Sequence, residues 1–162
     1  MAKLIASLAA HGEPVPSSNT AAYCNARSRL PEGLLSDLVR QSGRELQEQT
    51  PREWLWRGHA VKWVDGSTLS MPDTEANQQT YLQPTSQKPG LGFPIVRLVA
   101  IISYAIGAIL DVALGPYSGK GTGEHGLLRE LMHHFLPGDV VLGDRYYGSF
   151  FLIAALIEKG VE

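Results

Sequence analysis

Two aspartates of this chain have the residue type and the setting that metal chemistry requires. Asp65 follows the apolar run 60–64, and Asp144 follows the apolar run 140–143. Each run predicts a short strand, and a carboxylate at a strand end is held by rigid backbone while it faces solvent. Two such carboxylates can share one divalent cation, and hard oxygen ligands suit Mg²⁺. We therefore expect Asp65 and Asp144 to be metal ligands.

Each aspartate also has a simpler interpretation. Asp65 precedes Gly66, and Asp-Gly is a common turn dipeptide, while Asp after a buried strand is frequent in α/β proteins. Taken alone, either residue is more often a turn residue than a catalyst. The residues that flank them shift the balance toward a site.

Two basic residues are candidates for binding DNA phosphates. Arg145 directly follows Asp144, and Lys120 lies in the glycine-rich connection 115–123. A surface salt bridge is an equally good explanation for Arg145. Lys120 has no feature that assigns it to a phosphate rather than to solvent, because phosphate contacts are non-specific.

Composition sets the protein class. The chain has 162 residues, 44% of them hydrophobic, which suits one domain with a true core. Its single cysteine, Cys24, excludes a disulfide framework, and the absence of a Cys-x-x-Cys pair argues against structural zinc. This usage fits a reducing cytoplasm, and the family resemblance described below implies a bacterial, nucleoid-associated location.

Charge is divided unevenly along the chain. The net charge is −2, which is unlike a strongly basic DNA-coating domain. Residues 1–63 carry eight Lys/Arg and six Asp/Glu, whereas residues 64–162 carry six and ten. The acidic second part fits a metal-dependent site, and a solvated acidic surface explains it equally well.

No segment is predicted to cross a membrane. Residues 98–110 are the thirteen uncharged positions of the most apolar window, and a bilayer-spanning helix needs ~20. We expect this window to form buried strands. The N-terminal run 1–10 is short and contains Ser7, so we expect a frayed helix or a domain edge rather than a signal peptide.

The hydrophobic pattern predicts an order of elements that would bring the two aspartates together. Thr20 is expected to cap the first helix, and a stripe of leucines is expected on the second. The predicted elements are helices at 21–29 and from 31, a strand at 60–65, a loop at 72–90, a hairpin of strands 95–104 and 108–114, a helix at 124–136, a strand at 139–143 and a helix at 149–159.

This order predicts a mixed α/β fold of β-β-β-α-β-α type preceded by helices. We expect a helical segment at residues 1–58 and a sheet domain at residues 59–162. An antiparallel meander that meets a parallel central strand can place the ends of its first and fourth strands side by side. Asp65 and Asp144 would then be neighbours in space.

The residues around both aspartates resemble the catalytic domain of DDE-type insertion-sequence transposases. The resemblance rests on Val64-Asp65-Gly66-Ser67-Thr68, on Leu114-Gly115-Pro116-Tyr117, on the run 137–150 around Asp144, and on the upstream run 23–31. It covers roughly residues 20 to 162 and implies an incomplete ribonuclease-H-like sheet. It also implies Mg²⁺, with Mn²⁺ as substitute, double-stranded DNA at transposon ends as partner, and a homodimer on DNA as one arrangement.

The resemblance further implies phosphoryl transfer, with strand cleavage and joining at the element's ends. The third acid of that family is a Glu on a later helix, set in a spaced Tyr, Arg, Glu, Lys pattern. Glu158 and Glu162 do not match it, because they belong to the helix after Asp144 and to its end. We therefore expect a C-terminally truncated fragment that is inactive alone.

Other interpretations remain open. A catalytically dead remnant that binds DNA, or that inhibits an intact transposase, ranks second, and a small metal-dependent phosphohydrolase ranks last. The segment 118–123 does not match a nucleotide-binding phosphate loop. His125, His133 and His134 are predicted to be surface or helix-end residues, with His133 and His134 on different faces. Three tryptophans are predicted to pack rather than to stack on bases: Trp54, Trp56 and Trp63.

Overall fold

A computed structural model describes residues 10–12, 20–88, 90 and 92–162 of the chain. The prediction for residues 1–10 lies almost wholly outside the described residues. The chain divides into two compact units, residues 1–35 and residues 36–162. This division falls earlier than residue 58, where the sequence predicts the domain boundary, and that boundary stays a prediction.

The first unit holds helix α2 (Ala21–Arg27), as predicted. Thr20 precedes it, but the Thr20 side chain makes no capping hydrogen bond, so the predicted cap is wrong. Helix α3 (Glu32–Glu48) begins directly after Pro31, where a proline's missing N–H costs no helical bond.

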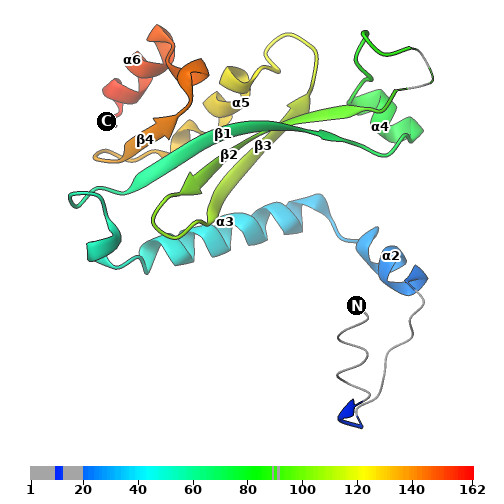
Figure 1. Cartoon of the computed structure of the whole chain (residues 1–162), viewed down its shortest axis with the longest axis horizontal. Coiled ribbons are helices and arrows are strands. Elements are labelled where there is room, and N and C mark those ends of the chain that lie inside the picture. Colours follow the sequence, from blue (N-terminus) through cyan, green and yellow to red (C-terminus); the bar gives the residue numbers. More distant parts are fainter. Residues whose placement is uncertain (1–9, 13–19, 89, 91) are drawn as a thin grey trace. The chain divides into compact units, whose positions relative to one another are not determined.

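The second unit is built on a four-stranded mixed sheet of order β3-β2-β1-β4 (Figure 1). Its strands are β1 (Val61–Ser70), β2 (Ile95–Ser103), β3 (Ile109–Pro116) and β4 (Val140–Gly143). β1 pairs antiparallel with β2 and parallel with β4. This confirms an α/β fold with a meander joined to a parallel strand, although β4 lies at the edge of the sheet and not at its centre.

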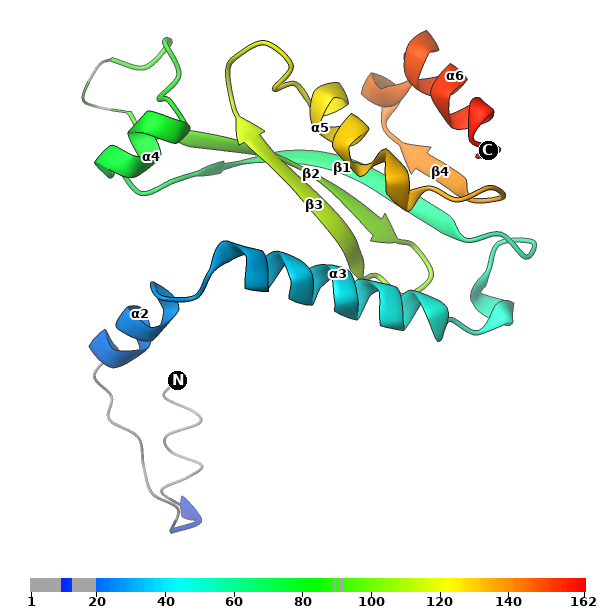
Figure 2. The same cartoon turned by 180° about the vertical axis from the view of Figure 1, so that it is seen from behind.

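Helices α5 (Glu124–Leu131) and α6 (Phe150–Glu158) lie on the same face of this sheet (Figures 1 and 2). The short helix η2 (Met132–His134) continues α5, so the predicted helix 124–136 is shorter and changes type. Short helix η3 (Arg145–Tyr147) follows β4 directly.

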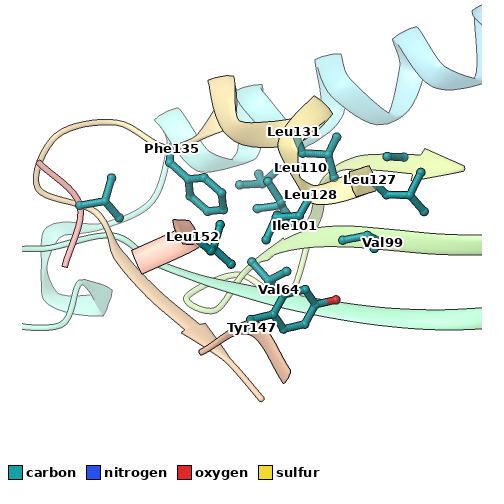
Figure 3. Packing of buried hydrophobic residues seen from close by; sticks show 12 residues of the cluster. Val64, Val99, Ile101, Leu110, Leu127, Leu128, Leu131, Phe135, Tyr147 and Leu152 are labelled. Atoms are coloured by element: carbon teal, nitrogen blue, oxygen red, sulfur yellow. The ribbon is translucent and has the colours of Figure 1, made fainter. Parts of the chain in front are cut away.

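The core lies between the sheet and these helices. Val64, Val99 and Ile101 from the strands meet Leu128 and Phe135, and all five side chains are at most 1% exposed (Figure 3). Alternation along β1 puts Lys62, Val64 and Gly66 on this covered face and Trp63 and Asp65 on the other. Half-exposed Trp63 and Leu142, which are register partners, confirm that the second face is open.

A buried ion pair fastens β4 to β1. Lys62 Nζ lies 2.5 Å from Asp139 Oδ2 and 2.5 Å from the His134 carbonyl oxygen, and both side chains are under 10% exposed. The same Asp139 oxygen accepts a 2.7 Å hydrogen bond from Leu136 N. The turn that leads into β4 is thereby tied to the neighbouring strand.

One packing prediction is wrong, because the three tryptophans are 44–57% exposed. The leucines of the apolar stripe on α3 are exposed too, with Leu38 at 53%, and Gly43 is the buried residue of that helix. These side chains are not packed into a core within the described part of the chain.

The predicted loop 72–90 contains helix α4 (Glu75–Thr80). Thr74 starts it, because its hydroxyl accepts a hydrogen bond from Asn77 N at 3.3 Å. Among the described residues, none of the helices is long and apolar enough to cross a bilayer.

Candidate metal centre

The sheet register places Asp65 and Asp144 side by side. The parallel pairing of β1 with β4 runs from Val61 opposite Val140 to Val64 opposite Gly143, so Asp65 and Asp144 are the next residues on the two strands. Neighbouring strands lie ~4.8 Å apart. Both aspartates are exposed. Alternation along β1 directs Asp65 toward the open face of the sheet, and Asp144 follows β4 directly in an extended conformation. The predicted proximity of the two residues is supported by this register.

One detail of the prediction is wrong, because β1 does not end at Asp65. The strand continues to Ser70, and Asp65 pairs with Ala100 of β2. What ends there is the pairing with β4. Asp65 is therefore held by a continuing antiparallel ladder on one side and has an open position on the other.

Each aspartate has one anchored oxygen. Asp65 Oδ1 accepts from Gly66 N at 2.9 Å, and Asp144 Oδ1 accepts from Tyr146 N at 2.9 Å, which caps η3. No hydrogen bond within the described residues occupies either Oδ2. Two fixed carboxylates with one unbonded oxygen each are a donor set that fits Mg²⁺, since this ion takes one or two carboxylates and keeps several waters.

A third carboxylate lies close by on the covered face. Glu124, the first residue of α5, accepts a hydrogen bond from the Tyr147 hydroxyl at 3.0 Å. A Cβ placed on Gly66 would lie 2.4 Å from Glu124 Cδ, so the carboxyl group of Glu124 rests directly on the Gly66 backbone. The sequence pattern did not single out Glu124, because it opens a helix between two glycines and no spacing links it to either aspartate.

All three carboxylates affect the pKa of Tyr147. Burial raises the pKa of the Tyr147 hydroxyl, and the hydrogen bond to Glu124 together with the charges of Glu124, Asp144 and Asp65 raises it further. Tyr147 therefore stays protonated and acts as a hydrogen-bond donor. Tyr147 is 7% exposed whereas Tyr146 is 56% exposed, so Tyr147 is the one of these two neighbouring tyrosines that packs into the core.

His125 also joins α5 to η3. Its Nε2 lies 2.8 Å from the Tyr146 carbonyl oxygen, and its Nδ1 lies 3.3 Å from Ser149 Oγ. The carbonyl must receive a proton from Nε2, so Nδ1 is the acceptor for the Ser149 hydroxyl. This histidine is thus part of the packing around Asp144.

Arg145 and Lys120 are both exposed, as candidates for phosphate contacts must be. None of the ion pairs among the described residues includes Arg145, so the salt-bridge alternative finds no partner there. Lys120 lies in the connection between β3 and α5, with Gly119 and Gly121 in left-handed conformations on either side.

A second cluster of possible ligands consists of Asp111, His133 and His134, whose ligand atoms lie within 4.8 Å of one another. The ring centroids of the two histidines are 4.1 Å apart, so the prediction that they face different ways is wrong. Asp111 already receives two 3.0 Å hydrogen bonds from Arg40 Nε and one of 2.7 Å from His134 Nε2. Its charge is neutralised by a guanidinium, which favours a structural role.

The pKa values in this cluster support that role. Burial lowers the pKa of His134, and the charges of His133 and Lys62 lower it further, whereas the hydrogen bond and the charge of Asp111 act to raise it; the pKa is lowered overall. For Asp111, burial acts to raise the pKa, but hydrogen bonds from Val112 N, His134 and Arg40 bring it below its usual value. Neutral His134 therefore donates to an ionised Asp111.

Comparisons with known proteins give one relative. The chain is 26% identical over 141 residues to a protein of Escherichia coli (strain K12) named "Putative transposase InsZ". No family model matches the chain, and no solved structure matches it. The match covers 86% of this chain and 46% of the relative, so the chain spans about half the length of that protein. Because the similarity covers most of this chain, it supports a transposase-like protein.

Proposed function

We propose that this chain carries two metal ligands of a DDE-type transposase, Asp65 and Asp144, on an incomplete ribonuclease-H-like sheet. The observation that carries the proposal is the register of β1 and β4, which makes the two aspartates adjacent. The similarity to a protein named as a transposase supports the reaction class.

In this proposal, Asp65 and Asp144 would hold Mg²⁺ through their unbonded oxygens. When bound, such an ion supplies Lewis acidity at a DNA phosphate and lowers the pKa of a bound water. The chain's own contribution is to fix both carboxylates before the ion arrives, through the Gly66 and Tyr146 amides. Arg145 and Lys120 are proposed to contact phosphates of double-stranded DNA.

Titration with Mn²⁺, followed by electron paramagnetic resonance, tests the metal site. We expect the unaltered chain to bind Mn²⁺ and both Asp65→Asn and Asp144→Asn to abolish that binding. Asp73→Asn is the matched control, because Asp73 is an exposed aspartate that bonds Gln78 at the far end of the sheet domain. Unchanged Mn²⁺ binding in the Asp65 and Asp144 variants would rule out these ligands.

Binding to a fluorescent DNA duplex tests the partner. We expect Arg145→Gln to weaken binding and to lower the slope of log affinity against log salt by about one unit. Arg129→Gln, an exposed arginine on α5, serves as control. DNA binding with intact Mn²⁺ binding but no cleavage would favour the inhibitor or remnant interpretation.

A further inference from the structure

The first turn of α5 forms hydrogen bonds with the segment that directly follows Asp144. Three contacts join them: Glu124 to the Tyr147 hydroxyl at 3.0 Å, His125 to the Tyr146 carbonyl at 2.8 Å, and His125 to Ser149 at 3.3 Å. All three reach residues within five positions after Asp144. Helix α5 therefore helps to fix the position of Asp144, although strand β4 separates the two in sequence.

Tyr147 contacts the backbone just before Asp144 and the carbonyl group of Asp144 itself. A Cβ on Gly143 would lie 3.2 Å from the Tyr147 ring, so the ring packs closely on the backbone just before Asp144. Tyr147 N also donates to the Asp144 carbonyl at 3.1 Å. A tyrosine held at its hydroxyl therefore fixes the turn in which Asp144 sits.

Glu124 also contacts the strand that carries Asp65. Glu124 Oε2 would lie 2.6 Å from a Cβ on Gly66, which is possible only because residue 66 is glycine. The same oxygen accepts the hydrogen bond from the Tyr147 hydroxyl. One carboxylate oxygen thus touches the backbone beside Asp65 and, through Tyr147, the turn of Asp144.

We propose that Glu124 is a positioning residue that sets the separation of Asp65 and Asp144 through Tyr147. The inference rests on the metal site proposed above. Glu124 is assigned positioning and not metal ligation for a geometric reason. Its Oε2 is bonded to Tyr147 and lies against Gly66 on the face covered by α5, whereas alternation along β1 directs Asp65 to the opposite face and each aspartate keeps an Oδ2 without a hydrogen bond among the described residues.

Mn²⁺ affinity of four variants tests this role. Residues that hold metal ligands in place typically contribute 10–100-fold to affinity, so we expect Glu124→Ala and Tyr147→Phe each to weaken Mn²⁺ binding by about tenfold. The double variant should be no weaker than either single one, because both remove the same hydrogen bond. Glu124→Gln keeps an oxygen acceptor and should retain most of the affinity. Unfolding curves of each variant fix a temperature at which all are folded.

The outcomes are distinct. If Glu124→Gln loses as much affinity as Glu124→Ala while Tyr147→Phe binds normally, Glu124 is a ligand and the positioning role is overturned. If Asp144→Asn abolishes binding but all Glu124 and Tyr147 variants bind like the unaltered chain, the positioning role fails and the metal site stands. If the unaltered chain binds no Mn²⁺, both proposals fall.

Discussion

At the scale of single residues, the buried Lys62–Asp139 pair shows how strongly one charge depends on another. Each side chain is under 10% exposed, so neither charge has water to replace a lost partner. Removing one member of a buried pair commonly costs ~3–5 kcal/mol, because the other charge stays buried and unpaired. We expect Lys62→Met to lower the free energy of unfolding by about that amount in urea titrations.

Lys120→Met is the control for that measurement, since Lys120 is exposed and should change stability by less than about 0.5 kcal/mol. A stability loss of similar size in both variants would show that the pair is not the cause. Asp139→Asn should resemble Lys62→Met, because it leaves the lysine charge without its carboxylate.

Residue-level prediction from sequence succeeded where backbone pairing alone decides the outcome. Asp65 and Asp144 are neighbours because each directly follows a stretch, 61–64 or 140–143, that pairs in parallel with the other, and apolar runs reveal such stretches. Glu124 could not be found in this way. Its position depends on how the first turn of α5 meets Gly66 and Tyr147, which is a tertiary contact that no local spacing encodes.

At the scale of elements, α3 approaches β3 at one glycine. A Cβ on Gly43 would lie 2.5 Å from the Ile109 carbonyl oxygen and 2.9 Å from Leu110 Cα, both of them backbone atoms that cannot move aside cheaply. We expect Gly43→Ala to weaken the contact between α3 and β3 and to lower the unfolding free energy by ~1–3 kcal/mol.

Gly33, on the same helix, supplies the matched comparison. Nothing lies within 4 Å of its Cβ position, so Gly33→Ala should gain up to ~1 kcal/mol from helix propensity. Opposite signs for the two substitutions, measured by thermal unfolding, are the expected result. A stabilising Gly43→Ala would contradict the close approach.

The Asp111–His134 contact joins β3 to η2, and the burial of His134 at this contact makes stability depend on pH. The pKa of His134 lies below 6.5 in the folded chain, mainly because of burial. Below pH 6.5 the unfolded chain therefore binds a proton at His134 more readily than the folded chain does. The free energy of unfolding falls as the pH decreases. The lowered pKa of Asp111 adds a second loss below pH 3.8.

We expect the melting temperature to decrease between pH 7 and pH 5, and His134→Gln to reduce this decrease. Glutamine keeps an N–H donor for Asp111 but has no titrating group. Melting curves at half-unit pH steps measure the effect. A variant with the same pH profile as the unaltered chain would assign the loss of stability to other groups.

Element boundaries were harder to predict than element types. The hairpin of β2 and β3 follows its β-branched pattern, with Gly107 in a left-handed conformation at the turn. The run Asp65-Gly66-Ser67-Thr68 has turn composition, yet pairing with β2 through Ser70 keeps it extended. Helix α4 was missed because its six residues, five of them polar, have little apolar periodicity.

At the scale of the whole molecule, large apolar side chains remain on the surface. Phe150 and Phe151 on α6 are 78% and 77% exposed, and Trp63 and Leu142 are half-exposed on the open face of the sheet. Phe150 and Phe151 lie together, with ring centroids 5.6 Å apart, and grouped exposed apolar side chains promote association in soluble proteins. We expect the isolated chain to associate as its concentration rises, and Phe150→Ser with Phe151→Ser to reduce this association.

Sedimentation velocity over a range of concentrations measures the effect. Tyr104→Ser provides a control, because Tyr104 is 66% exposed but lies after β2, on a separate element. A monomer at all concentrations would show that these side chains do not drive association.

The parallel pairing of β1 with β4 also has a consequence for the order of folding. β1, β2 and β3 form a meander from consecutive strands, whereas Val61 must find Val140, 79 positions later (140 − 61). Closing a longer loop costs more chain entropy, and non-local contacts slow folding. Asp65 would thus lie in the formed β1–β2 ladder before β4 pairs with β1 and places Asp144 beside it. A folding intermediate that holds only the meander would have the sheet's antiparallel part but only one of the two aspartates of the proposed cation site in place.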